Sequence, residues 1–431
     1  MQAVLTGWLY FGEWGTRADV FYENDGDLAA VATYLNEHMP TDQPVFVAVL
    51  HVPHPTLAAL ATDYDQLRLI PHGRALVLPA GGRATYIFPR NVPVPVWMRP
   101  LLPPPALLGS LGPDGEPTFA LYQLDSSVLR QPSHPLTANF SHALTLTGYD
   151  VGSGASGADL PLTLYWEVTG EPAESYLAYA HLEDGTGFRW SQIEQDGYPT
   201  VFWERGDRVI QQVAVPIRAG APPGAYRLRV GWFEPASGRP LARLDGDGRF
   251  AGNALLIENA FVLPAEAPPA VLPIPPVVWD EELWPGLRLV GVEPAPPTAV
   301  AGQPISVGLW WAAERPLPPL LVRLELIGAN NVGRILTTRP PAQGNYPFAD
   351  WPSPAFVVDR QTVEIPLGAG QRPLSPATQF GGGGGGGGHG CLGRDGVAGK
   401  RAVVCGARGG HGRGSGVWAG DSLVGLQFEE E

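Results

Sequence analysis

The chain has 431 residues and a formal net charge of −14, with 47 prolines and 55 glycines. This length predicts two to four domains with sizeable cores, and the acidic balance argues against a nucleic-acid partner, whose phosphates need a basic face. The turn-forming residues favour short strands over long helices. No apolar run reaches the ~18 to 20 residues that cross a bilayer, and the start lacks the basic segment of a signal peptide. Taken by itself, the chain is therefore expected to be soluble.

Residues 1–90 predict a small α/β unit. Asp25 or Asp27 caps a helix whose apolar residues recur at helical spacing. The run Pro44–Leu50 is continuously apolar, which is typical of a buried parallel strand, and residues 54–64 predict a second short helix before three further strands. This order indicates a doubly wound-like layer without a glycine-rich phosphate loop.

Residues 118–265 predict a β-sandwich, which follows a proline-rich linker at 91–117. Short alternating runs separated by Gly, Pro and Asp are typical of this architecture. Asp184 and Gly185 predict a tight turn between two strands. A second proline-rich linker, 266–276, closes the unit. The expected strands are residues 119–124, 143–151, 160–168, 176–184, 208–217, 225–234 and 255–263.

An internal repeat predicts a second sandwich at residues 277–370. LTLTGYDV reappears as LRLVGVEP, LTLYWEV as VGLWWAA, and VAVPIRAG as VEIPLGAG. Trp166 and Trp203 recur as Trp311 and Trp351, so these four side chains are assigned to the two cores. The second copy lacks a counterpart of PPGAYRLRVGWFE. The expected fold is thus an α/β cap followed by two tandem immunoglobulin-like β-sandwiches, the second of them incomplete.

Residues 371–431 are glycine-rich and contain both cysteines of the chain. Such a segment cannot bury enough apolar area to offset its conformational entropy, so it is predicted to be disordered. A genetic interpretation explains more: a homopolymer run in a GC-rich gene shifted the reading frame. His389, Cys391, Cys405 and His411 are residues of the zinc-ligating types, but their spacing fits no standard finger, and no metal is expected.

Two other groups of side chains are weighed as metal ligands. His51 and His54 follow a buried strand, where α/β sheets place ligands, but the two prolines beside them favour a structural loop. Asp184, Asp196 and Asp207 could gather at one end of the sandwich to bind calcium. Because aspartate is common in turns and no EF-hand spacing is present, structural roles are favoured.

Trp190 and Trp232 have no clear counterpart in the repeat, which makes them the candidates for a glycan-binding surface. Indole faces suit the apolar faces of sugar rings. Asn139-Phe140-Ser141 is a glycosylation sequon, a triplet that is frequent by chance. No Gly-x-Ser-x-Gly, phosphate-loop or HExxH motif occurs. We therefore expect no catalytic residues and no cofactor.

The run YFGEWGTRADVFY, with DGDLAAVATYLNEH, VFVAVLHVPHPTL and ALVLPAGG, resembles the extracytoplasmic portion of some bacterial multi-pass glycosyltransferases. These are the polyprenyl-phosphate-sugar-dependent, mannosyltransferase-like enzymes. The downstream patterns TGYDV, LTLYWEV, AHLEDGTG and PPGAYRLRVGWF are similar to the β-sandwich modules appended to them. The resemblance covers roughly residues 5 to 370. It implies an acidic residue in an early extracytoplasmic loop that acts as the catalytic base toward an acceptor hydroxyl, and since no position here matches that loop, no catalytic residue is carried over.

The resemblance implies a non-catalytic region at the extracytoplasmic face of the cell membrane. Its partners would be the missing membrane-embedded part of the same protein and a glycan or cell-envelope acceptor, which it positions or recognises. The alternative is a secreted or surface interaction or adhesion protein built from β-sandwiches. The third hypothesis is an independent sugar-processing enzyme.

Overall fold

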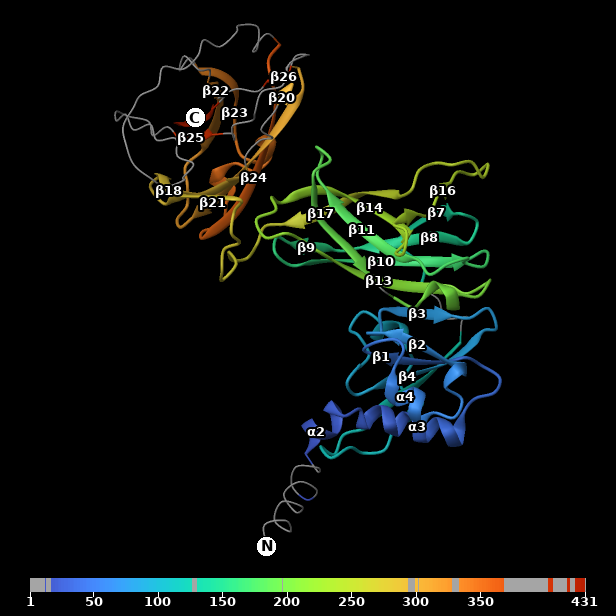
Figure 1. The fold of residues 1–431 in the computed structure, drawn as a ribbon. Helices are drawn as coiled ribbons and strands as arrows, with labels where there is room; N and C mark the ends of the chain where they lie inside the picture. The colour runs from blue at the N-terminus through green and yellow to red at the C-terminus, as the bar shows by residue number, and fades with distance from the viewer. Residues whose placement is uncertain are drawn as a thin grey trace, which may run out of the picture.

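The computed structural model of the chain is mostly β and contains several sheets, which confirms the all-β part of the predicted fold class (Figure 1). No helix in the described part of the chain combines the length and the apolar character that a bilayer crossing needs. The structure describes residues 12, 17–125, 130–195, 197–293, 299–300, 302–327, 333–367, 402–405, 417–418 and 423–430.

The N-terminal unit contains one mixed sheet, and the helix and strands predicted from residue 25 to 90 are confirmed. The sheet order is β2-β1-β4-β6-β5, with β1 parallel to β2 and β4, and with β6 antiparallel to β4. The strands are β1 (Val45–Val49), β2 (Leu67–Pro71), β4 (Arg83–Pro89), β5 (Leu107–Leu108) and β6 (Phe119–Asp125). The helices are α2 (Ala18–Glu23), α3 (Gly26–His38), α4 (Pro55–Leu60), η2 (Tyr64–Gln66) and η3 (Arg99–Leu101).

Strand β1 is apolar throughout because both of its faces are covered. Val45, Val47 and Val49 lie in one core cluster with the buried face of α3. Phe46 and Ala48 point to the other side, into a larger core that is shared with the first sandwich. A strand with one face exposed to solvent would instead alternate between apolar and polar residues. The α/β sheet is therefore a middle layer between its helices and the sandwich (Figure 1).

The two units exchange strands at their boundary, which differs from the predicted division at residue 118. β3 (Ala75–Leu78) belongs by sequence to the α/β unit, yet it pairs with β13 at the edge of a sandwich sheet. Conversely, β6, expected as the first sandwich strand, pairs with β4. The physical reason is that each of these strands finds an open sheet edge in the neighbouring unit, where its backbone groups become paired.

The first sandwich consists of two sheets, with strand orders β16-β7-β8-β10-β13-β3 and β12-β11-β14-β17-β9; β15 pairs with β14. Its strands are β7 (His134–Phe140), β8 (Leu144–Val151), β9 (Ser153–Ala155), β10 (Asp159–Val168), β11 (Leu177–Glu183), β12 (Arg189–Gln195), β13 (Arg208–Pro216), β14 (Gly224–Glu234), β15 (Arg239–Pro240), β16 (Arg243–Leu244) and β17 (Leu255–Leu263), with η4 at Thr200–Phe202. The turn predicted at Asp184 is confirmed, since Gly187 N–H donates to the Asp184 carbonyl and Asp184 N–H to that of Phe188.

The second sandwich repeats the strand order of one sheet of the first. Its sheets run β18-β19-β21-β24 and β23-β22-β27-β25, and β20 pairs with β26. The strands are β18 (Val277–Trp284), β19 (Leu287–Glu293), β20 (Ala299–Val300), β21 (Pro304–Ala313), β22 (Leu320–Ile327), β23 (Gly333–Arg339), β24 (Ala355–Glu364), β25 (Ala402–Cys405), β26 (Val417–Trp418) and β27 (Leu423–Glu430), with η5 at Ala342–Gly344 and η6 at Phe348–Asp350.

The register refines the repeat that the sequence suggested. Leu162 pairs with Val213, whereas its counterpart Val307 pairs with Gln361. The structural equivalent of Val213 is thus Gln361, two positions before the Val363 that the letter match selects. A shift by two keeps every side chain on the same face of the strand, so the match preserved the buried pattern but not the pairing.

The described strands of the final segment differ from the expectation of a tail without regular structure. β27 pairs antiparallel with β22 along its whole length, and β25 pairs with β27. β27 therefore occupies in the second sandwich the place that β14 has beside β11 in the first. The edge of β22 carries backbone groups that require hydrogen-bond partners, and β27 supplies these partners. Residues 371–401, with the eight-glycine run, lie outside the described residues.

Candidate functional site

The two tryptophans predicted to bind glycans are both buried. Trp190 is 4% exposed and Trp232 is 2% exposed. The Trp232 ring packs edge-on between Trp166, at 5.1 Å between ring centroids, and Trp203, at 5.6 Å. The Trp190 indole donates to the Asp184 carboxylate at 2.8 Å. Neither indole offers a face on which a sugar could stack, so these residues stabilise the core and a turn instead.

The aspartates weighed as calcium ligands are engaged within the fold. Asp184 Oδ1 accepts hydrogen bonds from the Thr186 and Phe188 backbone amides and from the Thr186 hydroxyl. Asp207 is 1% exposed, and its carboxylate accepts hydrogen bonds from two backbone amides. Asp196 lies outside the described residues. No three His, Cys, Asp or Glu side chains of the described ranges lie close enough to hold a metal ion. Asp184 thus acts as the cap of a hairpin turn.

Asp207 links the sandwich to the α/β unit. Its carboxylate accepts from the Glu204 amide at 3.0 Å, which closes the turn after Trp203, and from the Ala80 amide at 3.4 Å, just beyond β3. Burial raises the pKa of Asp207. Gly206 lies at φ +93° with Ala80 2.9 Å from the position of an added Cβ. Of the Arg205-Gly206-Asp207 triplet, Asp207 is thus buried against the α/β unit, whereas Arg205 and Gly206 are exposed.

The two histidines of the β1–α4 loop lie together. The rings of His51 and His54 stack at 5.5 Å between centroids, and His54 is 3% exposed. Burial lowers the pKa of His54. The Thr56 hydroxyl, at the start of α4, donates to Asp25 at 2.5 Å, which ties this loop to the start of α3. These contacts fit the structural loop favoured from the sequence.

Other predicted chemistry falls on turns or outside the described residues. Asn139 Oδ1 accepts from the His142 amide at 2.8 Å, so the sequon asparagine stabilises the turn between β7 and β8. His389, Cys391 and His411 lie outside the described residues, and Cys405 ends β25 with its side chain undescribed.

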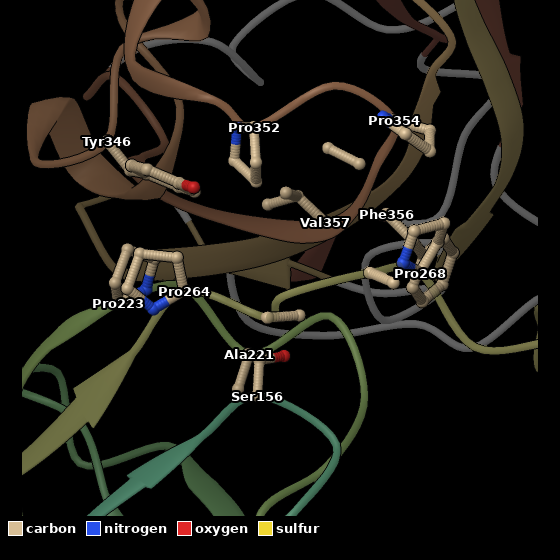
Figure 2. A pocket seen from close by; sticks show the side chains of 13 residues that line it. Ser156, Ala221, Pro223, Pro264, Pro268, Tyr346, Pro352, Pro354, Phe356 and Val357 are labelled. Carbon is tan, nitrogen blue, oxygen red and sulfur yellow. The ribbon is translucent and has the colours of Figure 1, made fainter.

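A shallow hollow, open to solvent, lies between the two sandwiches (Figure 2). Figure 2 shows prolines on both sides of it, including Pro223 and Pro264 from one module and Pro352 from the other. Its hydroxyl groups come from Ser156 and Tyr346, and the Ser156 oxygen already accepts from the Gly220 amide at 2.9 Å. A ligand pocket needs several convergent polar groups, so this hollow is a seam between modules.

Charged side chains join the modules beside this seam. Glu293 accepts from Arg218 of the first module at 2.8 Å and from Arg360 of the second through its other oxygen. The Arg360 guanidinium lies 3.5 Å from the Phe188 ring centroid and that of Arg218 lies 5.0 Å from the Trp310 ring centroid. The three ionic groups and two rings hold β24 and β19 against the end of the first sandwich.

The outward face of the β12-β11-β14 sheet is the strongest candidate for a binding surface. β11 alternates between Ala178, Ala180 and Leu182, which are buried in the core, and Tyr179, His181 and Glu183, which lie on the opposite face of the sheet. On that face Tyr179 and His181 are half-buried, and Glu183 is buried. Directly opposite them on β14 lie Gly231, Arg229 and Arg227, and on β12 lie Glu194, Gln192 and Arg189. The sequence signal for this face is the alternation in YLAYAHLED, which a search for tryptophans does not detect.

Comparison with known proteins gives little. No family model matches the chain, and no curated protein matches it. Solved structures similar to it include dimeric latent PorU from Porphyromonas gingivalis, with 11% identity and a TM-score of 0.15 over 61% of this chain and 21% of that one. Another is the C-terminal globular domain of an oligosaccharyltransferase from Pyrococcus abyssi, with 11% identity and a TM-score of 0.14 over 67% and 54%. The chain thus spans about a fifth and about half of these two structures. Scores this low do not establish a shared fold.

Proposed function

We propose that the chain is the non-catalytic extracytoplasmic region of a membrane glycosyltransferase. The membrane-embedded part of the same protein would transfer a sugar from a lipid-linked donor. The role of this region would be to hold or recognise a glycan acceptor with its α/β cap and two immunoglobulin-like sandwiches. The proposal rests on the sequence resemblance of residues 5 to 370 to such regions.

The structural observation that supports this role is the insertion of β3 into the sandwich sheet. Four residues of the α/β unit pair with Arg208, Val209, Ile210 and Gln211 of β13, and the two units share one core. A shared sheet and core leave little freedom for the units to move separately. A rigid body of this kind suits the positioning of an acceptor at a fixed distance from a catalytic part.

The second candidate is a secreted or surface interaction protein. Leu256, Phe261 and Leu263 on β17 are 42%, 49% and 41% exposed. Exposed apolar side chains grouped on one strand favour contact with another protein.

Fractionation of source cells separates the two candidates. An antibody against residues 130–263 should detect a membrane-bound product much larger than 45.9 kDa, and those membranes should transfer sugar from a polyprenyl-phosphate donor. A 45.9 kDa product released into the medium would exclude the transferase proposal and support the interaction protein.

A further inference from the structure

The Tyr179 ring is fixed in place on the outward face of the sheet. A Cβ added at Gly231, directly opposite, would lie 2.6 Å from the Tyr179 hydroxyl oxygen and 2.7 Å from its Cζ. The glycine therefore provides the space in which the ring lies against the backbone of β14. The hydroxyl donates to the Asn253 carbonyl at 3.2 Å. A ring held in this way loses little conformational entropy when a ligand stacks on it.

Two further rings extend this surface along the strands. The His181 ring lies 4.8 Å from that of Tyr179 at 33°, and the Phe233 ring lies 6.2 Å away at 55°. Burial lowers the pKa of His181 to about 4, with Arg189 adding to the effect. The imidazole is therefore neutral at physiological pH and can serve as both a donor and an acceptor. Its Nδ1 is buried without a hydrogen-bond partner.

Polar groups surround the rings in fixed orientations. Arg229 donates to both carboxylate oxygens of Glu183, at 2.8 and 3.0 Å, and this geometry holds the pKa of Glu183 below its usual range. Arg189 donates to the Gln192 side-chain oxygen at 2.8 Å. This leaves the Gln192 amide protons for other acceptors. Planar, pre-oriented groups of this type give directional hydrogen bonds.

The charges on this face are balanced, in contrast to the net charge of −14 of the whole chain. The face and the neighbouring β17 carry Arg189, Arg227 and Arg229 beside Glu183, Glu194 and Glu258. An anionic polymer would need cations that are not neutralised in place, and a strongly charged protein partner would need a matching charge. An uncharged ligand with many hydroxyl groups requires neither.

We infer that the outward face of β12, β11 and β14 binds a neutral saccharide, with a sugar ring stacked on Tyr179 and hydroxyl groups hydrogen-bonded to His181, Gln192 and the Glu183–Arg229 pair. This inference rests on the proposed function, because it identifies the acceptor-recognising surface of that region. It replaces the buried Trp190 and Trp232 as the sugar-contacting residues.

The test is binding of the purified full chain to an array of neutral mannose, glucose and galactose oligosaccharides, printed beside polygalacturonate and other uronic acid polymers. The neutral oligosaccharide with the highest signal is then titrated by calorimetry. We expect Tyr179→Leu and His181→Ala each to weaken binding at least about tenfold, and Tyr179→Phe, which keeps the ring, to stay within about threefold of wild type.

The matched control is Tyr149→Leu. Tyr149 stacks on His134 at 4.8 Å and 5°, in the other sheet of the same sandwich, so its loss should leave binding unchanged. If Tyr179→Leu lowers the melting temperature, Gln192→Ala, an exposed change on the same face, takes its place and should also weaken binding.

Three results would overturn the inference: no neutral oligosaccharide bound, binding confined to uronic acids, or equal losses in the Tyr149 and Tyr179 variants. Any of these in a chain found in a membrane-bound transferase would leave the proposed function intact. Conversely, saccharide binding through Tyr179 by a secreted chain would uphold the inference and remove the transferase proposal.

Discussion

A tryptophan in each sandwich makes the same hydrogen bond. The Trp203 indole donates to the Tyr198 carbonyl at 2.9 Å, and the Trp351 indole donates to the Tyr346 carbonyl at 3.1 Å. Each pair encloses a short 3-10 turn that begins after a proline. The buried indole has its donor satisfied within its own turn. The recurrence of this motif in the repeat therefore reports a local structure and not a binding site.

Asp359 is a buried carboxyl whose titration should affect stability. Burial raises its pKa from 3.8 to about 6, although hydrogen bonds from the Ala342 amide and Gln361 favour the charged form. Because the folded pKa exceeds the unfolded one, the stabilisation is complete below about pH 4 and is lost as the pH rises through 6. The loss is on the order of 2 to 3 kcal/mol.

Asp359→Asn removes this titration. The free energy of unfolding of the variant, from urea denaturation, should rise relative to wild type by that amount between pH 4 and pH 7. The exposed Asp350→Asn in the same module is the control and should show no such gain. Parallel curves for wild type and Asp359→Asn across this range would contradict the prediction.

Gly220 is a second residue whose replacement should be costly. Its φ is +85°, and an added Cβ would lie 2.8 Å from Val358 Cγ2 and 2.9 Å from Phe356 Cε1, in the second module. Its carbonyl also accepts from the Val358 amide. Gly220→Ala should destabilise the junction by about 1 to 3 kcal/mol in urea denaturation.

The control for this substitution is Gly157→Ala. Gly157 has the same φ of +85°, but an added Cβ would meet nothing closer than Ala219 at 3.7 Å. It therefore measures the backbone cost alone. Equal losses in the two variants would show that contact with Val358 and Phe356 does not matter.

At the scale of elements, the side chain of Tyr86 on β4 secures the exchanged strand β3. The Tyr86 hydroxyl accepts from the Val77 amide at 2.9 Å and donates to the Val77 carbonyl. Both backbone groups lie on the edge of β3 and are buried with the Tyr86 ring, which is 1% exposed. The α/β unit thus satisfies the free edge of the strand it contributes.

Tyr86→Phe should leave these two groups without a partner. We expect a loss of about 1 to 3 kcal/mol in the free energy of unfolding and faster hydrogen exchange of the Val77 amide. Tyr122→Phe is the control, because its ring packs edge-on against Phe88 in the same sheet. Unchanged exchange at Val77 would show that the hydroxyl does not hold β3.

At the scale of the whole molecule, Glu293 joins the two sandwiches through Arg218 and Arg360. The Glu293 and Arg360 side chains are 17% and 16% exposed, and removal of the carboxylate charge would leave two guanidinium groups close together. Glu293→Gln should therefore weaken the coupling between modules by about 1 to 2 kcal/mol, less than for a fully buried pair because Arg218 is 35% exposed.

Small-angle scattering should show a broader distance distribution for Glu293→Gln, and the two sandwiches should melt in more separate steps. Glu234→Gln is the control, since Glu234 pairs with Arg239 inside one hairpin at 3.2 Å. A scattering curve identical to wild type would show that apolar contacts alone set the arrangement of the modules.

Local patterns predicted much of this protein. The alternation in residues 160–168 predicted β10, the apolar run at 44–50 predicted β1, and helical spacing predicted α3. Trp190 shows the limit of such reasoning. Lack of a counterpart in the repeat could not reveal whether Trp190 was exposed, because its burial depends on Tyr226, which packs edge-on against it from β14, as well as on the neighbouring Phe188.

Period-two alternation and turn residues, which act over a few positions, predicted β8, β10, β11, β13, β14 and β17 and a sandwich pattern that occurs twice. They did not predict β7 or β12. The tertiary structure alone decided that β3 and β6 exchange sheets, that β27 pairs with β22, and that Tyr179 faces outward over Gly231. These outcomes depend on which open sheet edge or glycine lies opposite a strand. The pairing of two distant segments has no signal in the local sequence of either segment.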